Sequence, residues 1–203
     1  MTQSLRRLQE IESMKKSIIE ACVQMIHAEG IESISVRKIA SMIHYSPSLL
    51  YHYYPDKDAL IAEVIGSLYL DMNQKLRNVP YHPDSKQLFR NRLETFIKIA
   101  LSEPTSYLAA MRSKLPQIKS QTDILVKDVL KVKPGFKLMS QSISEISGIV
   151  DEDALESLSQ IVWISTYGLI DRLIHEQVDI EKATKLINAN LDYHLSALEG
   201  MNK

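Results

Sequence analysis

The stretch HYSPSLLYHYYPDKDAL, residues 44–60, contains four of the nine tyrosines in this chain of 203 residues. Its residues include signals for the start and the end of a helix. Ser46 is a residue that favours the N-cap, and Pro47 follows at the first helical position, where its missing N–H costs no hydrogen bond. Pro55 stops the helix. The stretch therefore predicts a short helix over residues 47–54, with another helix directly after it.

Hydrophobic periodicity predicts helices along the whole chain. Gly30 follows the first of them, at a place where a left-handed residue commonly ends a helix. The segment IESISV (31–36) alternates as a strand does, but it is so short that we interpret it as a turn. We therefore expect an all-α fold with helices at about 5–28, 36–42, 47–54, 57–77, 86–102, 105–114, 117–132, 136–147, 152–175 and 180–198.

The composition is that of an ordinary soluble globular protein, with 45% hydrophobic and 24% charged residues. The N-terminus opens with charged residues and has no apolar segment of the kind that a secretory signal needs. The single cysteine, Cys22, excludes an intrachain disulfide and is expected to be a buried, inert thiol in a reducing compartment. We expect a cytoplasmic protein with no membrane segment.

Charge is distributed unevenly along the chain, although the net charge is only −1. Residues 1–59 are neutral, residues 60–150 carry thirteen Lys and Arg against eight Asp and Glu, and residues 151–203 carry four against ten. This is not the strongly basic balance of a protein that coats nucleic acid by charge alone. If DNA is bound, a small set of well-placed contacts must bind it.

The first helix and the two short helices after it, the latter joined by a tight turn, predict a helix-turn-helix over about residues 35–54. At 100° per residue, Leu50 and Tyr54 lie on one side of the second short helix, which we expect to face the core. Tyr51 and Tyr53 flank the outward side. In this motif the second short helix enters the DNA major groove, so phenols at its two edges would meet phosphates.

Spacing alone leaves a second interpretation open. The same residues also describe a small helical subdomain with exposed tyrosines and no nucleic-acid partner. Tyr45, in the turn, is expected to pack its ring under the motif.

Residues 30–60, GIESISVRKIASMIHYSPSLLYHYYPDKDAL, resemble the DNA-binding signature of the tetracycline-repressor-like (TetR) family of bacterial transcriptional regulators. The resemblance implies an N-terminal helix-turn-helix DNA-binding domain, residues 5–77, and a helical ligand-binding and dimerisation domain, residues 78–203. It also implies a repressor that a small molecule releases from a near-palindromic double-stranded operator. The DNA-contact positions that it implies are Ser35, Arg37, Ser46, Pro47, Ser48, Leu49, Tyr51, His52, Tyr53 and Lys57.

Two positions of the turn depart from the family pattern. His44 stands where the family usually has glycine, and the position requires a positive φ, which His tolerates better than most residues. Tyr45 stands where the family usually has valine. Both changes leave the motif intact but make the tilt of the second short helix harder to predict.

The two C-terminal helices have apolar and small residues at helical spacing, which predicts a four-helix bundle formed by two copies of the chain. The alternative is that both stripes belong to the core of one chain. The residues that we predict at a homodimer interface are Ala154, Leu158, Ile161, Ser165, Gly168, Arg172, Ile187, Leu191 and Leu195.

Large apolar residues with a few polar groups predict a cavity for a small-molecule effector in the second domain. Each of them is also an ordinary core residue when considered alone. The set is Phe96, Ile97, Tyr107, Met111, Phe136, Met139, Trp163 and Tyr167.

Two other classes of protein compete with a DNA-binding regulator. An enzyme is disfavoured because the chain has no Gly-rich phosphate loop, no His-x-x-x-His helix and no Gly-x-Ser-x-Gly turn. Its six histidines have no metal-ligand spacing, so we expect neither a metal nor a cofactor. A scaffold protein is disfavoured because that function does not explain why the helix at 47–54 starts with proline and has phenols on both edges.

Overall fold

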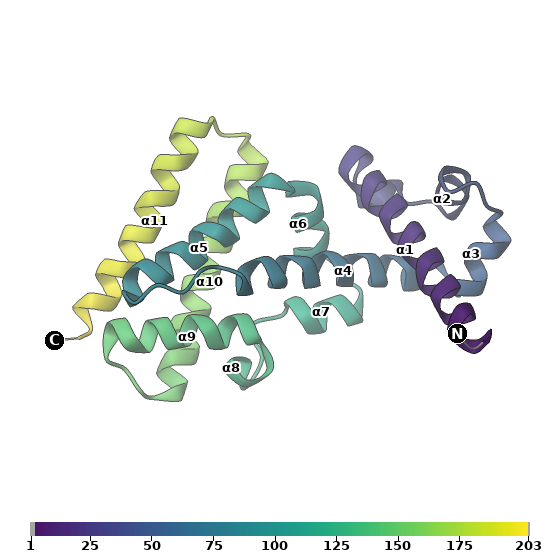
Figure 1. Cartoon of the computed structure of the whole chain (residues 1–203). Helices are drawn as coiled ribbons and strands as arrows, with labels where there is room; N and C mark the ends of the chain where they lie inside the picture. Colours follow the sequence, from purple (N-terminus) through teal and green to yellow (C-terminus); the bar gives the residue numbers. More distant parts are fainter. Residues whose placement is uncertain (1–2, 203) are drawn as a thin grey trace. The chain divides into compact units, whose positions relative to one another are not determined.

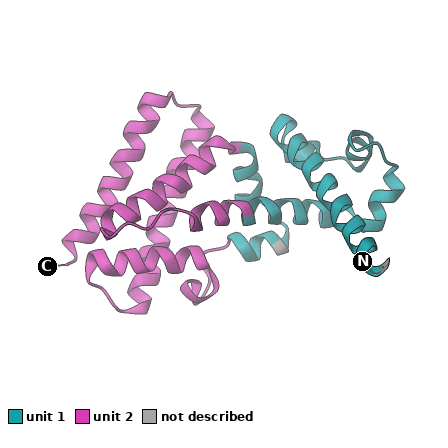
Figure 2. Ribbon diagram, viewed as in Figure 1, with its two compact units in different colours: residues 1–70, 105–122 teal, residues 71–104, 123–203 magenta. Residues whose placement is uncertain are grey.

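The computed structural model describes residues 3–202, and all regular structure in this range is helical, which confirms the all-α class (Figure 1). The chain forms two compact units, residues 1–70 with 105–122 and residues 71–104 with 123–203 (Figure 2). This division differs from a single boundary at residue 78. Within residues 3–202, no helix has both the length and the apolar character needed to cross a membrane.

The first unit contains the helices around the quoted stretch. Leu50 and Tyr54 lie in one buried cluster with Ile18 and Cys22 of the first helix and with Leu60 of the fourth. The elements are α1 (Gln3–Glu29), the 3₁₀ helix η1 (Ile31–Ser33), α2 (Val36–Met42), α3 (Pro47–Tyr53), the beginning of α4 (Lys57–Arg77), α6 (Pro104–Met111) and α7 (Pro116–Thr122).

A second, smaller cluster explains why residues 105–122 belong to the first unit. Ile65 of α4 is fully buried and packs with Ala110 of α6 and Ile118 of α7. Sequence periodicity predicted these helices but had no means of assigning them to a unit, because the apolar stripes of α6 and α7 look alike wherever they dock.

Helix α1 is buried only in its C-terminal part. Leu5 and Leu8 are 52% and 54% exposed, whereas Ile18 and Cys22 are fully buried. Residues 4–10 are all exposed, so Leu5 and Leu8 take no part in the core. Burial raises the pKa of the Cys22 thiol to about 12, so the thiol stays protonated and unreactive.

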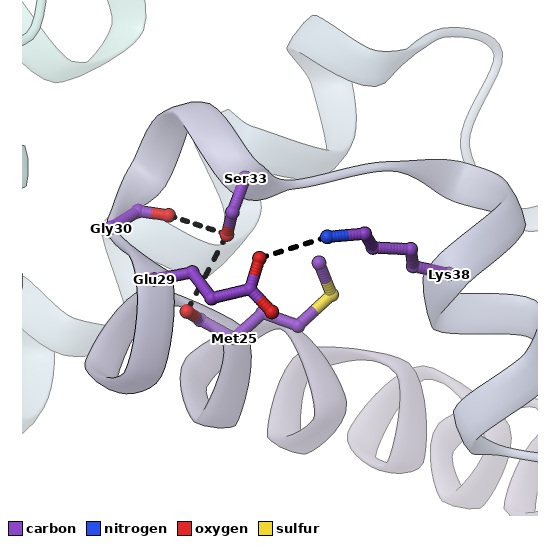
Figure 3. A network of polar contacts seen from close by, with 5 residues as sticks. All are labelled: Met25, Glu29, Gly30, Ser33 and Lys38. Carbon is purple, nitrogen blue, oxygen red and sulfur yellow. Dashed lines mark hydrogen bonds and ion pairs between the residues drawn. The ribbon is translucent and has the colours of Figure 1, made fainter.

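The end of α1 is tied to the two elements that follow it (Figure 3). Gly30 has φ 86° and ψ 168°, a region open essentially only to glycine rather than the left-handed helical region that we expected. The Ser33 hydroxyl donates to the Gly30 carbonyl at 2.6 Å, and Lys38 of α2 pairs with Glu29 at 2.8 Å. These contacts fix where α2 starts relative to α1.

The turn between α2 and α3 is a Schellman motif centred on His44. The Tyr45 N–H donates to the Ala40 carbonyl at 2.8 Å and the His44 N–H to the Ser41 carbonyl at 3.2 Å. His44 has φ 59°, as the family pattern requires of this position. Its side chain is exposed.

The second unit is a helical bundle with one main core. Phe89 of its first full helix, Ile143, Val162 and Leu191 are buried together. The elements are the end of α4, α5 (Ser85–Ser102), α8 (Val129–Val132), α9 (Pro134–Ser147), α10 (Glu152–Glu176) and α11 (Ile180–Gly200).

The helix predicted at 117–132 is interrupted. Residues 123–128 are not helical, and Asp128 has φ 57° directly before α8. Ile124 is buried with Val129, and its carbonyl accepts a hydrogen bond from the Gln160 side chain at 2.9 Å. A tertiary contact thus takes the place of a helical hydrogen bond, and apolar periodicity gave no sign of it.

Charged pairs join the helices of the second unit. Lys86 pairs with Glu199 at 2.6 Å, and Arg90, one turn further along α5, pairs with Asp192 of α11. Arg92 is half-buried, and its Nη1 donates to the Leu138 carbonyl and to the Ser142 hydroxyl, each at 2.9 Å. These contacts fix the register of α5 against α9 and α11.

His194 of α11 is 4% exposed, and its Nε2 atom is buried without a hydrogen-bond partner among the described residues. Burial lowers the pKa of this imidazole below its ordinary value of 6.5. The folded chain therefore holds His194 neutral, whereas the unfolded chain protonates it at a higher pH.

This difference predicts that part of the stability is lost in acid. As the pH falls through the unfolded pKa of about 6.5 toward the lower folded pKa, the unfolded state binds the extra proton and gains stability. Urea unfolding of wild type should show a free energy that falls over this range, and His194→Phe should flatten the fall. Equal slopes for wild type and His194→Phe would refute the assignment.

The positive φ of His44 predicts that His44→Gly stabilises the first unit slightly. Removing the Cβ relieves about 1–2 kcal/mol of left-handed strain, and the added freedom of the unfolded chain costs about 0.4–1 kcal/mol. Thermal melting should therefore show an equal or higher midpoint, with the preferred DNA sequence unchanged. A lower midpoint would contradict the strain argument, and a loss of DNA affinity at raised stability would make the imidazole itself a contact.

Candidate nucleic-acid interface

Helix α3 is short, and its two ends are fixed by different means. The Ser46 hydroxyl accepts a hydrogen bond from the Leu49 N–H at 3.3 Å, and Pro47 occupies the first turn, as predicted. Leu50 and Tyr54 are 1% and 4% exposed and anchor the helix on the core. The backbone leaves the helix at Tyr54, which is extended with φ −134°.

Anchoring on Leu50 and Tyr54 turns the opposite side of α3 to solvent. Ser48, His52 and Tyr51 are exposed, the last to 53%. Leu49 and Tyr53 are only half-buried, and Tyr53 packs its ring against the core of the first unit. The outward face therefore presents two hydroxyls and an imidazole, which can donate hydrogen bonds to phosphates and base edges.

The predicted contacts on α2 lie at its N-terminus. Ser35 is the N-cap residue, and its backbone is extended, but its side chain makes no capping hydrogen bond. The Ser35 hydroxyl therefore does not cap α2. Arg37, in the first turn of α2, is exposed.

Lys57 begins α4 and is exposed. The Asp56 carboxylate accepts from the Ala59 N–H at 2.7 Å, which caps the helix as predicted. A lysine at a helix N-terminus combines its own charge with the positive end of the helix dipole, an arrangement that suits a phosphate.

The structure corrects the expectation for Tyr45. Its side chain is 49% exposed rather than packed under the motif. The residue after His44 thus lies partly in solvent, and its ring is not enclosed by the core. Met42, 42% exposed, lies three residues earlier in the same stretch.

One interaction in this region was not predicted. Lys15 of α1 pairs with Glu63 of α4 at 3.2 Å, and the Lys15 ammonium lies 5.2 Å from the centre of the Tyr54 ring. The pair joins residues 48 positions apart. Helical periodicity could at most place these two residues on their helices. Nothing in the sequence marks a lysine and a glutamate on two different helices as partners.

The eight predicted effector-cavity residues are divided between the two units. Tyr107 and Met111 belong to the first unit, and the other six to the second. In the second unit Phe136, Met139 and Trp163 contact one apolar cluster, and the Tyr167 ring stacks on Trp163 with centres 5.0 Å apart. Phe96 and Ile97 are buried on α5, at 8% and 0% exposure.

The predicted dimer residues fall into three groups, which are half-buried, fully buried and exposed. Half-buried members pack partly against their own core: Leu158, Ile187 and Leu195. Ala154 is also half-buried, and Ser165 accepts a hydrogen bond from Asn190 at 3.0 Å. Leu191 is fully buried in that core, so it has no exposed surface to offer a partner.

The exposed members of the set lie along α10. Ile161 is 57% exposed, and Gly168 and Arg172 are also exposed at helical spacing from it. Further exposed apolar residues accompany them, namely Ile164 at 48%, Leu186 at 40% and Tyr193 at 68%. The two C-terminal helices therefore carry large apolar side chains that their own chain does not cover.

Among residues 3–202, no three His, Cys, Asp or Glu side chains gather as a metal site requires. The exposed face of α3, the start of α2 and the start of α4 all lie in the first unit and all present hydrogen-bond donors or positive charge.

Comparison with known proteins identifies the first unit. Residues 18–64 match the family model described as bacterial regulatory proteins of the tetR family. No curated protein matches the sequence.

Solved structures with low sequence identity share the fold of nearly the whole chain. A protein of unknown function from Rhodococcus sp. RHA1 is 12% identical, with a TM-score of 0.73 over 91% of this chain and 95% of that one. A transcriptional regulator from the same organism is 15% identical, with a TM-score of 0.71 over 93% and 98%. A TetR-like transcriptional regulator from it is 19% identical, with a TM-score of 0.62 over 89% and 94%.

The matched residues 18–64 contain the capped helix α3, its buried anchors and the positive-φ turn before it. Residues 18–64 thus carry the signature of bacterial regulatory proteins of the tetR family, and nearly the whole chain shares the fold of solved structures that include a TetR-like transcriptional regulator.

Proposed function

We propose that the chain is a DNA-binding repressor that a small molecule releases from its operator, acting in the cytoplasm where the operator lies. The observation that carries this proposal is the orientation of α3. Burial of Leu50 and Tyr54 leaves Ser48, Tyr51 and His52 exposed on the helix that enters the major groove in this motif.

The side chains at this surface, of which Leu49 and Tyr53 are half-buried, favour a particular mode of recognition. Tyr51, Tyr53, Lys57 and Arg37 are suited to phosphate contacts, which position a protein without reading sequence. The groups left to read bases, chiefly Ser48 and His52 with Ser46, Pro47 and Leu49, include none of the Arg or Asn residues that make bidentate base contacts. Apolar contact with thymine methyl groups and DNA shape therefore contribute much of the specificity.

A homodimer on a near-palindromic site follows from a single reading helix per chain. The exposed apolar side chains of α10 and α11 support an interface made by two helices from each copy. Two reading helices related by a two-fold axis require half-sites related in the same way.

An effector acts on DNA binding only if it has different affinities for the competent and incompetent states. The cluster of Phe136, Met139, Trp163 and Tyr167 supports a largely apolar ligand with an aromatic surface to stack on. Helix α4 is one continuous helix, Lys57–Arg77, that starts with a proposed phosphate contact and contributes residues to both units. We propose that α4 couples effector binding to DNA binding.

The contact assignments predict a contrast between α3 variants. Tyr51→Phe should weaken binding to every duplex by about fivefold, the value of one hydrogen bond of about 1 kcal/mol. Lys57→Ala should weaken binding uniformly and reduce the salt slope by about one. His52→Ala should instead alter the selected bases. Affinities for a selected site and for random duplexes, measured across salt concentrations, check all three.

Tyr81→Phe is the matched control, because Tyr81 is 82% exposed and lies outside the first unit. It should bind as wild type does. The assignment fails if Tyr51→Phe changes the selected sequence while His52→Ala leaves it unchanged.

The interface assignment predicts that Ile161→Glu separates the dimer. A carboxylate at this exposed apolar position would be buried unpaired between copies, which costs several kcal/mol. Sedimentation at micromolar concentration should show a dimeric wild type and a monomeric variant. Val150→Glu, at a position 85% exposed outside the helices, should stay dimeric. A monomeric wild type would refute the interface.

A further inference from the structure

Three segments of the first unit meet at one cluster of side chains. Lys15 comes from α1, Glu63 from α4, and Tyr54 is the residue that ends α3. The Lys15 Nζ atom lies 3.2 Å from Glu63 Oε2 and 5.2 Å from the centre of the Tyr54 ring. One ammonium group thus neutralises a carboxylate and faces an aromatic ring, which is the geometry of a cation–π contact.

Tyr54 is held by its ring rather than by its hydroxyl. The side chain is 4% exposed, and its hydroxyl makes no hydrogen bond of standard geometry. Burial, followed by the nearby negative charge of Glu63, raises the pKa of the phenol, so the ring stays neutral. Packing against the core, the Lys15 ammonium on its face and the nearby Glu63 carboxylate therefore hold this ring.

These contacts are too weak to account for folding, since the Lys15 and Glu63 side chains are 37% and 40% exposed. Exposed pairs of this kind contribute little stability in general. The core residues Leu50, Leu60 and Val64, all buried, hold the unit together without them. The cluster can still decide orientation, because α3 has only seven residues and its C-terminal end is held by a few side chains, the buried Leu50 and Tyr54 and the half-buried Tyr53.

The orientation of that end bears directly on the proposed contacts. Tyr51 and Tyr53 lie in the same helical turn as the anchor Tyr54, so a change in its tilt moves both phenols. Phosphate contacts tolerate little displacement, since a hydrogen bond weakens steeply outside its distance range.

We propose that Lys15 and Glu63 are positioning residues for DNA binding, which act through the Tyr54 ring to set the C-terminal end of α3. The inference rests on the proposed function. It assigns neither residue to the DNA itself. Lys15 lies before residues 18–64, which match the family model, so the family signature does not include this lysine.

The test compares variants for affinity to a selected duplex, salt slope and melting. Lys15→Met and Glu63→Gln should each weaken specific binding by about three- to tenfold, the range expected for a cation–π contact and a half-exposed ion pair. The salt slope should stay that of wild type, unlike that of Lys57→Ala. Lys15→Arg should bind within about twofold of wild type, because a guanidinium preserves both contacts.

Two further variants separate the possible causes. Lys16→Met is the matched control, since Lys16 is 79% exposed and pairs only within α1, and it should bind as wild type does. In the double variant Lys15→Glu/Glu63→Lys the two charges are exchanged. The ion pair is kept, but a carboxylate now lies against the negative face of the Tyr54 ring, so this variant should not restore binding. The ¹³C resonances of the Tyr54 ring should move in Lys15→Met and not in Lys16→Met.

Three results would overturn the inference. They are wild-type affinity in Lys15→Met, a reduced salt slope in that variant, which would make Lys15 a phosphate contact, and full recovery in the exchanged pair. A wild-type chain that binds no duplex would instead refute the proposed function, and the two failures are therefore distinct.

Discussion

Burial of Leu50 and Tyr54 on one side of a seven-residue helix is the constraint on which the proposed interface depends. A helix this short is marginal in isolation, so its direction comes from what it packs against. Once these two side chains are enclosed, helical spacing leaves Ser48, Tyr51 and His52 no direction but outward. The core of the first unit thus fixes which groups are available to DNA.

Much of this region could be predicted because its signals are local. A capping serine before a proline starts a helix wherever it occurs, and the structure places the Ser46–Pro47 pair at the start of α3. The positive φ of His44 was expected from the family resemblance, because glycine is usual at this position, and two backbone hydrogen bonds of adjacent residues define the turn. The all-α class followed from periodicity that persists along the chain.

The features that were not predicted, or were predicted wrongly, depend on contacts between residues far apart in sequence. The break at 123–128 depends on Gln160 reaching the Ile124 carbonyl, and the Lys15–Glu63 pair joins two separate helices. Leu191 was predicted at an interface because an apolar stripe has the same pattern whether it faces its own core or a partner. The exposure of Tyr45 depends on which side chains pack around the turn, and residue spacing does not encode this.

Selection of duplexes from random DNA by the wild-type chain tests the central claim most directly. We expect enrichment of one near-palindromic sequence, bound by two copies of the chain. The same selection with Ser48→Ala and His52→Ala together should enrich a different sequence or none. Recovery of unenriched DNA by the wild type, or the same enriched sequence from both proteins, would contradict the assignment of α3 as the reading helix.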